Sequence, residues 1–290
     1  MTTPQQHTAA NEHWDMVIEP HARLFDLKLK EVWNYRDLLF LFVKRDFSAQ
    51  YKQTILGPLW HVIQPIFTTI VFLLVVGKIA NIPTDGIEPV LFYMSGISIW
   101  NYFSSCLTAT SNTFIANAGI FGKVYFPRLV IPLSTVMSNI VKFGIQFSLL
   151  LAVMAWYGIK TGHFYFGASW LLIPLLVIMM AGLGLGLGII ISSLTTKYRD
   201  FTVLIGFAVQ LLMYATPIAY PMSFLKSKSF AAWIAWNPLT PIVEAFRFAL
   251  FGTGAIHTMG LLYSAGVIAV LLFAGLLVFS KVERTFMDTV

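Results

Sequence analysis

Residues 170–194 read WLLIPLLVIMMAGLGLGLGIIISSL and contain no charged side chain. A helix of about 20 apolar residues is long enough to cross the ~30 Å hydrocarbon core of a bilayer. Five other apolar windows reach this length, so the sequence predicts an all-α integral membrane protein with six transmembrane helices. The six predicted spans are 59–80, 89–111, 136–158, 170–194, 202–221 and 258–280.

The composition excludes a water-soluble enzyme. Of the 290 residues, 57% are hydrophobic and 11% are charged, whereas a soluble domain carries about 25% charged residues. In such a chain the formal charge of +6 indicates membrane orientation and contact with anionic lipid, and we expect no nucleic-acid partner. The one cysteine, Cys106, has no second cysteine to pair with, which excludes a disulfide within the chain.

The distribution of lysine and arginine predicts the orientation of the spans. Thirteen of these residues lie in segments 1–58, 112–135, 195–201 and the C-terminal tail, and four lie in the loops on the other side. Cytoplasmic loops carry the excess of positive charge, so both termini are expected in the cytoplasm.

Two lysines, Lys78 and Lys142, fall inside predicted spans. Lys78 lies near the outer end of its span, where the long stem lets the ammonium group reach the interface. Lys142 lies close enough to the cytoplasmic end of its span to reach the phosphate layer of the bilayer. A contact with a substrate phosphate is the alternative role for Lys142.

The segment before the first span is predicted to contain a flexible tail, residues 1–23, and an amphipathic interfacial helix, residues 24–58. The first 20 residues lack the apolar core of a secretory signal, so the N-terminus is expected to be retained. In the helix, apolar residues recur at three-and-four spacing, and the longest apolar run, 38–43, is too short to span. Packing of this helix on a partner protein is an alternative that is compatible with the interfacial position.

Glycine and proline mark two features between the spans. The loop 112–135 is interrupted by glycines and prolines, and we expect it to hold one short cytoplasmic helix at about 117–128. Four glycines occupy alternate positions from Gly182 to Gly188. They lack the spacing of a dinucleotide-binding loop, and small residues four apart instead let helices approach closely.

Residues 222–257 predict a re-entrant segment at the outer face. They contain two apolar pieces that are too short to span, and such broken helices are tolerated where protein or a water-filled cavity covers the backbone. Asn237 followed by Pro238 is a signal for the start of the second piece, and Gly252 is a signal for its end.

The chemistry of hydrolysis is missing from the sequence. Segment 119–124, GIFGKV, lacks the first glycine of an ATP-binding loop and has Val124 where Ser or Thr binds magnesium. The acidic residues are scattered over different loops and the histidines lie at different depths, so no metal site is predicted. We therefore expect a transport subunit without its own ATPase site. An integral-membrane enzyme that acts on lipid-linked sugars is the alternative.

Several segments of the sequence carry a family pattern. The order of interfacial helix, six spans and outer re-entrant pair resembles the membrane subunit of the ABC transporters that export O-antigen, capsule or teichoic acid. The matching segments are KRDFSAQYKQTILGPLW at 44–60, NAGIFGKVYFPRLVIPLS at 117–134, TKYRDF at 196–201, TPIAYP at 216–221 and NPLTPIVEAFR at 237–247.

The resemblance implies a homodimer of this chain with two copies of a separate nucleotide-binding ATPase subunit. ATP and magnesium would bind to that partner, and no cofactor or metal to this chain. The implied substrate is a polysaccharide, with O-antigen preferred, carried on undecaprenyl pyrophosphate. It would move from the inner leaflet of the bacterial inner membrane through a channel between the protomers, in contact with membrane lipids. An exporter of a small lipid or drug with the same fold is the alternative.

Two groups of candidate residues follow for the substrate. Basic residues of the interfacial helix are predicted to position the lipid headgroup, with topology signalling as the alternative: Arg36, Lys44, Arg45 and Lys52. Sugar rings have apolar C–H faces and hydroxyl edges, so aromatic side chains suit a sugar channel. The predicted channel-lining residues, for which membrane belt or packing roles are the alternative, are Trp60, Phe67, Trp100, Tyr102, Phe103, Tyr214 and Tyr220.

Two further groups of candidate residues are predicted, one at the channel exit and one at the contact with the ATPase subunit. Residues of the outer half-helices are predicted to narrow the channel exit: Trp233, Trp236, Glu244 and Arg247. The last two share a helix face, where they either pair or line a polar path. Aromatic residues flanked by charges are predicted to form the contact with the ATPase subunit, on a short helix that ends at Pro127. The alternative is a solvated loop whose basic residues only set the membrane orientation. These residues are Phe121, Lys123, Tyr125, Phe126 and Arg128.

Overall fold

The computed structural model describes residues 29–52, 54–121, 123–124, 126–162, 165, 167–198, 200–225, 231–254 and 256–289. Every regular element in these residues is helical, which confirms the all-α class. Four helical stretches are long and apolar enough to cross a membrane, namely Gly57–Ile79, Val130–Thr161, Ala168–Thr195 and Thr258–Val282.

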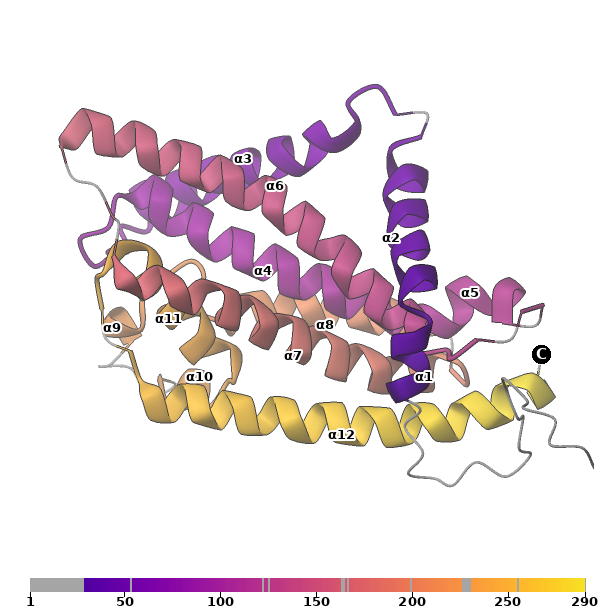
Figure 1. Cartoon of the computed structure of the whole chain (residues 1–290). Helices are drawn as coiled ribbons and strands as arrows, with labels where there is room; N and C mark the ends of the chain where they lie inside the picture. The colour runs from indigo at the N-terminus through magenta and orange to yellow at the C-terminus, as the bar shows by residue number, and fades with distance from the viewer. Residues whose placement is uncertain are drawn as a thin grey trace, which may run out of the picture.

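The long helices run alongside one another (Figure 1). Two short 3-10 helices, η1 (Gly57–Leu59) and η3 (Ala168–Leu171), precede α3 and α7. The long elements are α3 (Trp60–Phe72) with its π-helical continuation η2 (Leu73–Ile79), α4 (Pro89–Ser111), α6 (Val130–Thr161), α7 (Leu172–Thr195), α8 (Phe201–Tyr214) and α12 (Thr258–Thr289).

Two of the predicted spans differ in length from the helices observed. α6 begins at Val130, inside the predicted loop 112–135. Pro132 lies in the first turn of α6, where a proline removes no helical hydrogen bond, so it does not interrupt the helix. α8 has 14 residues, which is about 21 Å at 1.5 Å per residue and shorter than the bilayer core.

α7 lies between α4 and α12, and glycines of α7 lie at its contact with each of these two helices. A methyl group at Gly188 would lie 2.6 Å from Cβ of Thr110 on α4, and one at Gly184 would lie 2.8 Å from Cβ of Cys106. Gly182 meets α12 in the same way, with 2.8 Å to Cγ2 of Ile268. The prediction that these glycines serve helix packing is confirmed.

One end of the bundle is crossed by the N-terminal helices α1 (Leu29–Asn34) and α2 (Arg36–Tyr51), which are separated at Tyr35 (Figure 1). The short helix α5 (Thr113–Phe121) lies at this end. Aromatic contacts join these parts, because the rings of Phe42 and Phe126 are 5.7 Å apart. The rings of Phe114 and Phe279 are stacked at 4.7 Å and join α5 to α12.

The opposite end of the bundle holds α9 (Met222–Leu225), α10 (Ala231–Ala235) and α11 (Leu239–Phe251) (Figure 1). The side-chain Oδ1 of Asn237 accepts a hydrogen bond of 3.0 Å from the backbone N–H of Leu239, at the start of α11. Gly252 ends α11 in the left-handed conformation, with φ of 67°. The predicted end of this helix is therefore confirmed, whereas the helix begins at Leu239, one residue after Pro238, the predicted first helical residue.

Candidate functional site

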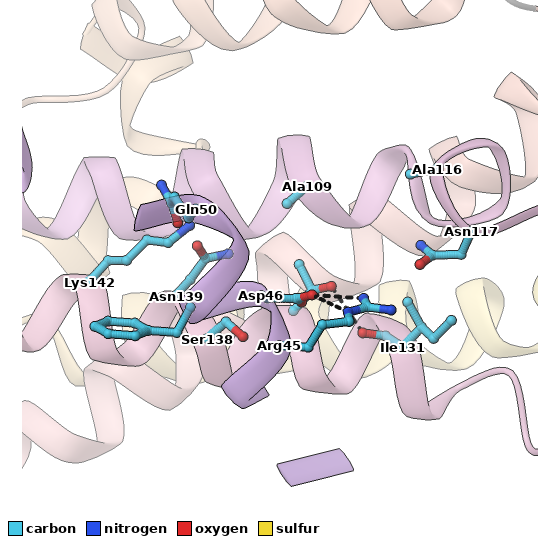
Figure 2. A pocket seen from close by; sticks show the side chains of 12 residues that line it. Arg45, Asp46, Gln50, Ala109, Ala116, Asn117, Ile131, Ser138, Asn139 and Lys142 are labelled. Carbon is cyan, nitrogen blue, oxygen red and sulfur yellow. Dashed lines mark hydrogen bonds and ion pairs between the residues drawn. The ribbon is translucent and has the colours of Figure 1, made fainter. Parts of the chain in front are cut away.

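A cavity of about 320 Å³ lies where α2 passes over α4 and α6, next to α5 (Figure 2). This volume is at the lower end of the ~300–1,000 Å³ range of small-molecule sites. The cavity is lined mainly by polar side chains, and its lining residues are Arg45, Asp46, Phe47, Gln50, Ala109, Ala116, Asn117, Ile131, Thr135, Ser138, Asn139 and Lys142.

The charges of the cavity do not cancel. Arg45 donates to Oδ1 of Asp46 through Nε at 2.9 Å and through Nη2 at 2.7 Å, and its guanidinium lies 4.6 Å from the ring centre of Phe42. The ammonium of Lys142 forms no ion pair in the part of the chain that the structure describes. Asp46 also acts electrostatically on Lys142 but is paired with Arg45 (Figure 2), so two cations of the cavity, Arg45 and Lys142, share one acid.

The α6 wall of the cavity is a polar helix face. Residues 135, 138, 139, 142 and 146 follow three-and-four spacing, so their side chains lie on one side of α6. The Oγ of Ser138 and the Nδ2 of Asn139 are buried without a hydrogen-bond partner. Buried donors without a protein partner are rare in folded proteins, and such groups are explained by strain, by a water molecule or by a bound ligand.

A groove of about 410 Å³ continues from this cavity along α4 and shares Ala109, Asn139 and Lys142 with it. Its α4 wall is again polar and consists of Ser104, Ser105, Thr108, Ala109 and Asn112. Farther along, Nδ2 of Asn101 donates to Oε1 of Gln146 at 3.4 Å. α4 and α6 thus meet along a row of uncharged polar groups with one cation, Lys142.

The predicted headgroup residues lie on α2 and just after it, and one of them lines the cavity. Arg45 is that residue, whereas Arg36, Lys44 and Lys52 are exposed outside it. At the end of α2, burial raises the pKa of the Tyr51 hydroxyl. The headgroup prediction missed Ser138 and Asn139. The signal for them was the polar three-and-four spacing that leads to Lys142 on α6.

The seven predicted channel residues fall into different environments. Trp60, Phe67 and Tyr214 are at least 54% exposed, and Tyr220 is half-buried with its hydroxyl donating to the Tyr214 carbonyl at 2.7 Å. The three predicted channel residues that lie on α4 are at most 5% exposed, because α4 is covered by α6 and α7. Trp100, Tyr102 and Phe103 are therefore core residues of this chain, and this burial does not support their prediction as channel-lining residues.

The predicted residues of the channel exit also differ in their exposure. Trp233 and Trp236 are exposed, whereas Arg247 is buried. Arg247 does not form the expected ion pair with Glu244 in the described part of the chain. Its two terminal nitrogens donate to the carbonyls of Pro217 and Ile218, each at 2.6 Å.

The predicted coupling segment is folded differently from the expectation. α5 ends at Phe121, and proline 127 precedes α6 instead of ending the short helix. Phe121 and Phe126 are each 5% exposed, and their rings are 5.9 Å apart in the aromatic cluster. Both side chains are buried among the rings of Phe42 and Phe114, so they are not exposed anchors for a partner. Tyr125 lies outside the described residues, and the guanidinium of Arg128 lies 5.3 Å from the Phe121 ring centre.

Comparison with known proteins identifies the family. The profile of the ABC-2 type transporter family matches residues 37–251, which include all segments that carried the resemblance. The O-antigen export system permease protein RfbA of Klebsiella pneumoniae is 30% identical over 266 residues, which are 90% of this chain and 98% of the relative. A protein of the same description from Myxococcus xanthus is 26% identical over 266 residues, 90% of this chain and 98% of the relative. The polysialic acid transport protein KpsM of Escherichia coli is 23% identical over 256 residues, 87% of this chain and 95% of the relative. The chain therefore belongs to the ABC-2 type transporter family.

Proposed function

We propose that the chain is the transmembrane subunit of an ABC exporter that moves polysaccharide linked to undecaprenyl pyrophosphate, with O-antigen as the preferred cargo. The polar row along α4 and α6 supports this function, because hydroxyl and amide side chains can exchange hydrogen bonds with sugar hydroxyls and carry little charge. The relatives named as O-antigen and polysialic acid transporters support the same cargo class over a small lipid or drug.

In the proposed topology, α4 joins the four long apolar stretches as a span. α8 alone is shorter than the bilayer core, so it would complete the count of six only together with residues 215–221 that follow it. The excess of lysine and arginine around α2 and α5 supports a cytoplasmic position for that end of the bundle. We propose that both termini are also cytoplasmic and that the chain lies in the bacterial inner membrane. α11 has 13 residues, about 20 Å at 1.5 Å per residue. It is too short to span, which supports a re-entrant pair at the outer face.

In the proposed assembly, two copies of the chain face each other and two ATPase subunits bind beneath them. α3 and α8 each leave apolar side chains exposed, among them Phe67 and Phe207. These faces would meet the second copy across the channel, with Trp60 and Tyr214 at its wall. ATP and magnesium would be held by the ATPase, since we assign no cofactor to this chain.

The ATPase contact is proposed on the exposed side of α5 and the residues after it. Ile115 and Val124 are exposed apolar side chains there, and Lys123 is exposed between them and the buried cluster. Phe121 and Phe126 lie beneath this surface and connect it to Phe42 on α2. A push on α5 would therefore reach α2 through packed rings, since packed cores transmit strain.

Deletion of the gene tests the proposed function. Loss of the chain should abolish the surface polysaccharide while lipid-linked polysaccharide accumulates in the cytoplasmic leaflet, and a plasmid copy should restore export. Immunoblots of surface glycan and extraction of lipid-linked glycan measure both quantities. Normal surface glycan in the deletion strain, with altered efflux of a small lipid or drug, would contradict the proposal.

Replacing Arg36, Lys44, Arg45 and Lys52 together with glutamine should reduce export by at least about tenfold. Each basic residue near an anionic surface contributes roughly 1 kcal/mol of attraction, so four of them bind a phosphate-bearing headgroup substantially more tightly. Surface glycan is measured at matched levels of membrane-inserted protein. Lys78→Gln with Lys160→Gln is the control, because both residues are exposed outside α2. Unchanged export in the α2 variant would leave these residues as topology signals.

Combining Lys123→Glu with Val124→Ser should release the ATPase from the purified complex. The substitutions reverse a charge and remove an apolar contact at the proposed docking surface, and such exposed anchors carry much of an interface's binding energy. Retention of the ATPase after affinity purification is the measurement. Met259→Ser on α12, also exposed, is the control. Full retention in the double variant would place the ATPase contact elsewhere.

A further inference from the structure

We propose that the cavity between α2, α4 and α6 binds a phosphate or diphosphate group through the ammonium of Lys142 and the side-chain amide of Asn139. This inference rests on the proposed function, because it assigns the phosphate of the lipid-linked cargo to particular residues. It also changes the earlier assignment, since the main cation lies on α6, in a long apolar stretch, and not on α2.

The uncompensated charge is the first observation that points to an anion. Lys142 lies within Val130–Thr161, a helix long and apolar enough to span. A lysine at such a place is costly unless it pairs with an opposite charge or faces a polar cavity. Asp46 is the one acid that lines the cavity, and it is held by Arg45 at 2.7 Å. An anionic ligand would supply the missing partner, and lysine binds phosphate as a point charge.

The buried donors are the second observation. Asn139 is 2% exposed, and its Nδ2 has no hydrogen-bond partner. The neighbouring Cys106 thiol is at most a weak acceptor for that group. A half-turn of the amide about its last bond exchanges Oδ1 and Nδ2, so that Oδ1 accepts from the thiol and Nδ2 donates into the cavity. Asn139 lies one turn before Lys142 on α6 and both line the cavity, so after this half-turn both donors would face the same volume.

The surroundings of the cavity favour an anion carried by a lipid. Ile140 and Val141, between the two donors in sequence, are 44% and 41% exposed on the other side of α6. The cavity borders Val130–Thr161, a helix long and apolar enough to span, so an apolar chain attached to the bound phosphate would leave the cavity into the bilayer beside this helix. The polar groove of Ser104, Ser105 and Thr108 leads away from the site on the α4 side and offers hydroxyl partners to an attached glycan.

Thermal unfolding of the full-length chain in phosphatidylcholine nanodiscs tests this site, with tryptophan fluorescence as the readout. The probes are farnesyl diphosphate, inorganic pyrophosphate and farnesol. Farnesyl diphosphate should raise the Tm by several degrees, because a ligand that binds the folded state stabilises it. Lys142→Gln should weaken that binding by about 10- to 100-fold, as expected for one charge-assisted contact. Lys160→Gln, an exposed lysine at the end of the same helix, should bind as the wild type does.

Asn139→Leu separates binding from folding. Replacing a buried donor that has no partner by an apolar side chain of similar size should leave the Tm without ligand unchanged or higher. The same variant should reduce the ligand-induced shift. A structural role for Asn139 predicts the opposite pattern, with a lower Tm and an unchanged shift, and that pattern would overturn the proposal.

The probes also distinguish the source of the phosphate. A shift with farnesyl diphosphate alone supports a lipid-borne phosphate, and an equal shift with inorganic pyrophosphate supports a site for the free anion. An equal shift with farnesol, or full binding by Lys142→Gln, overturns the site. The mass of the purified particle reports how many copies of the chain it holds. If Lys142→Gln lowers this mass and leaves ligand binding unchanged, Lys142 contacts a second copy and the site is overturned. If the chain restores polysaccharide export yet shows no Lys142-dependent shift, the site is wrong and the proposed function stands.

Discussion

Replacing Arg247 with methionine should lower the free energy of unfolding by roughly 3–5 kcal/mol, the size expected when one partner of a buried charged hydrogen-bond group is removed. The guanidinium is 5% exposed, lies 3.7 Å from the ring centre of Phe92 on α4, and donates to the carbonyls of Pro217 and Ile218. It thus joins α11, α4 and the turn after α8. The variant should unfold at a temperature lower by roughly 10 °C, measured by fluorescence-detected size exclusion after heating.

Two further variants test whether the loss of stability in Arg247→Met comes from the contacts of its guanidinium. Gly96→Ala should destabilise the same joint, because a methyl group there would lie 2.7 Å from Nη2 of Arg247 and 3.0 Å from the Ile218 carbonyl oxygen. Trp233→Leu, at an exposed position of the same outer segment, should leave stability unchanged. If Arg247→Met unfolds at the wild-type temperature while export falls, Arg247 lines a polar path and its structural role is refuted.

Replacing Gly188 with alanine should separate α7 from α4 and lower stability by about 1–3 kcal/mol, the usual cost of overpacking a close contact. The added methyl would lie 2.6 Å from Cβ of Thr110 and 3.2 Å from the Leu107 carbonyl oxygen, so the α4 backbone would have to move. The change is measured as the loss of the monodisperse peak after heating in detergent.

Gly144→Ala on α6 is the matched control for Gly188→Ala. Nothing lies within 4 Å of a methyl group at Gly144, and alanine is the better helix former by about 1 kcal/mol. This variant should therefore be neutral or more stable than the wild type. A loss of equal size at both positions would mean that the helices tolerate no added methyl anywhere, and the argument from close approach at Gly188 would fail.

The aromatic residues show where prediction from sequence reached its limit. The sequence predicts Trp60 and Trp100 as lining residues of the same channel, because both are aromatic residues of predicted spans. One is exposed and the other is buried, because α4 is enclosed by α6 and α7 while α3 has an open face. A helix that is apolar around its whole circumference carries no periodic signal that separates a lipid-facing side from a core side.

The sequence by itself determined the all-α class, the presence of long apolar helices, the end of α11 and the close packing at the glycines. Each of these depends on residues that are neighbours along the chain, such as a run of apolar side chains or a glycine after the last turn. Only the tertiary structure decided that Phe121 and Phe126 are covered, that Arg247 binds two carbonyls, and that Arg45 pairs with Asp46, the acid that lines the cavity with Lys142. The burial and pairing of a side chain depend on which other helices approach it, and that approach brings together residues far apart in the sequence.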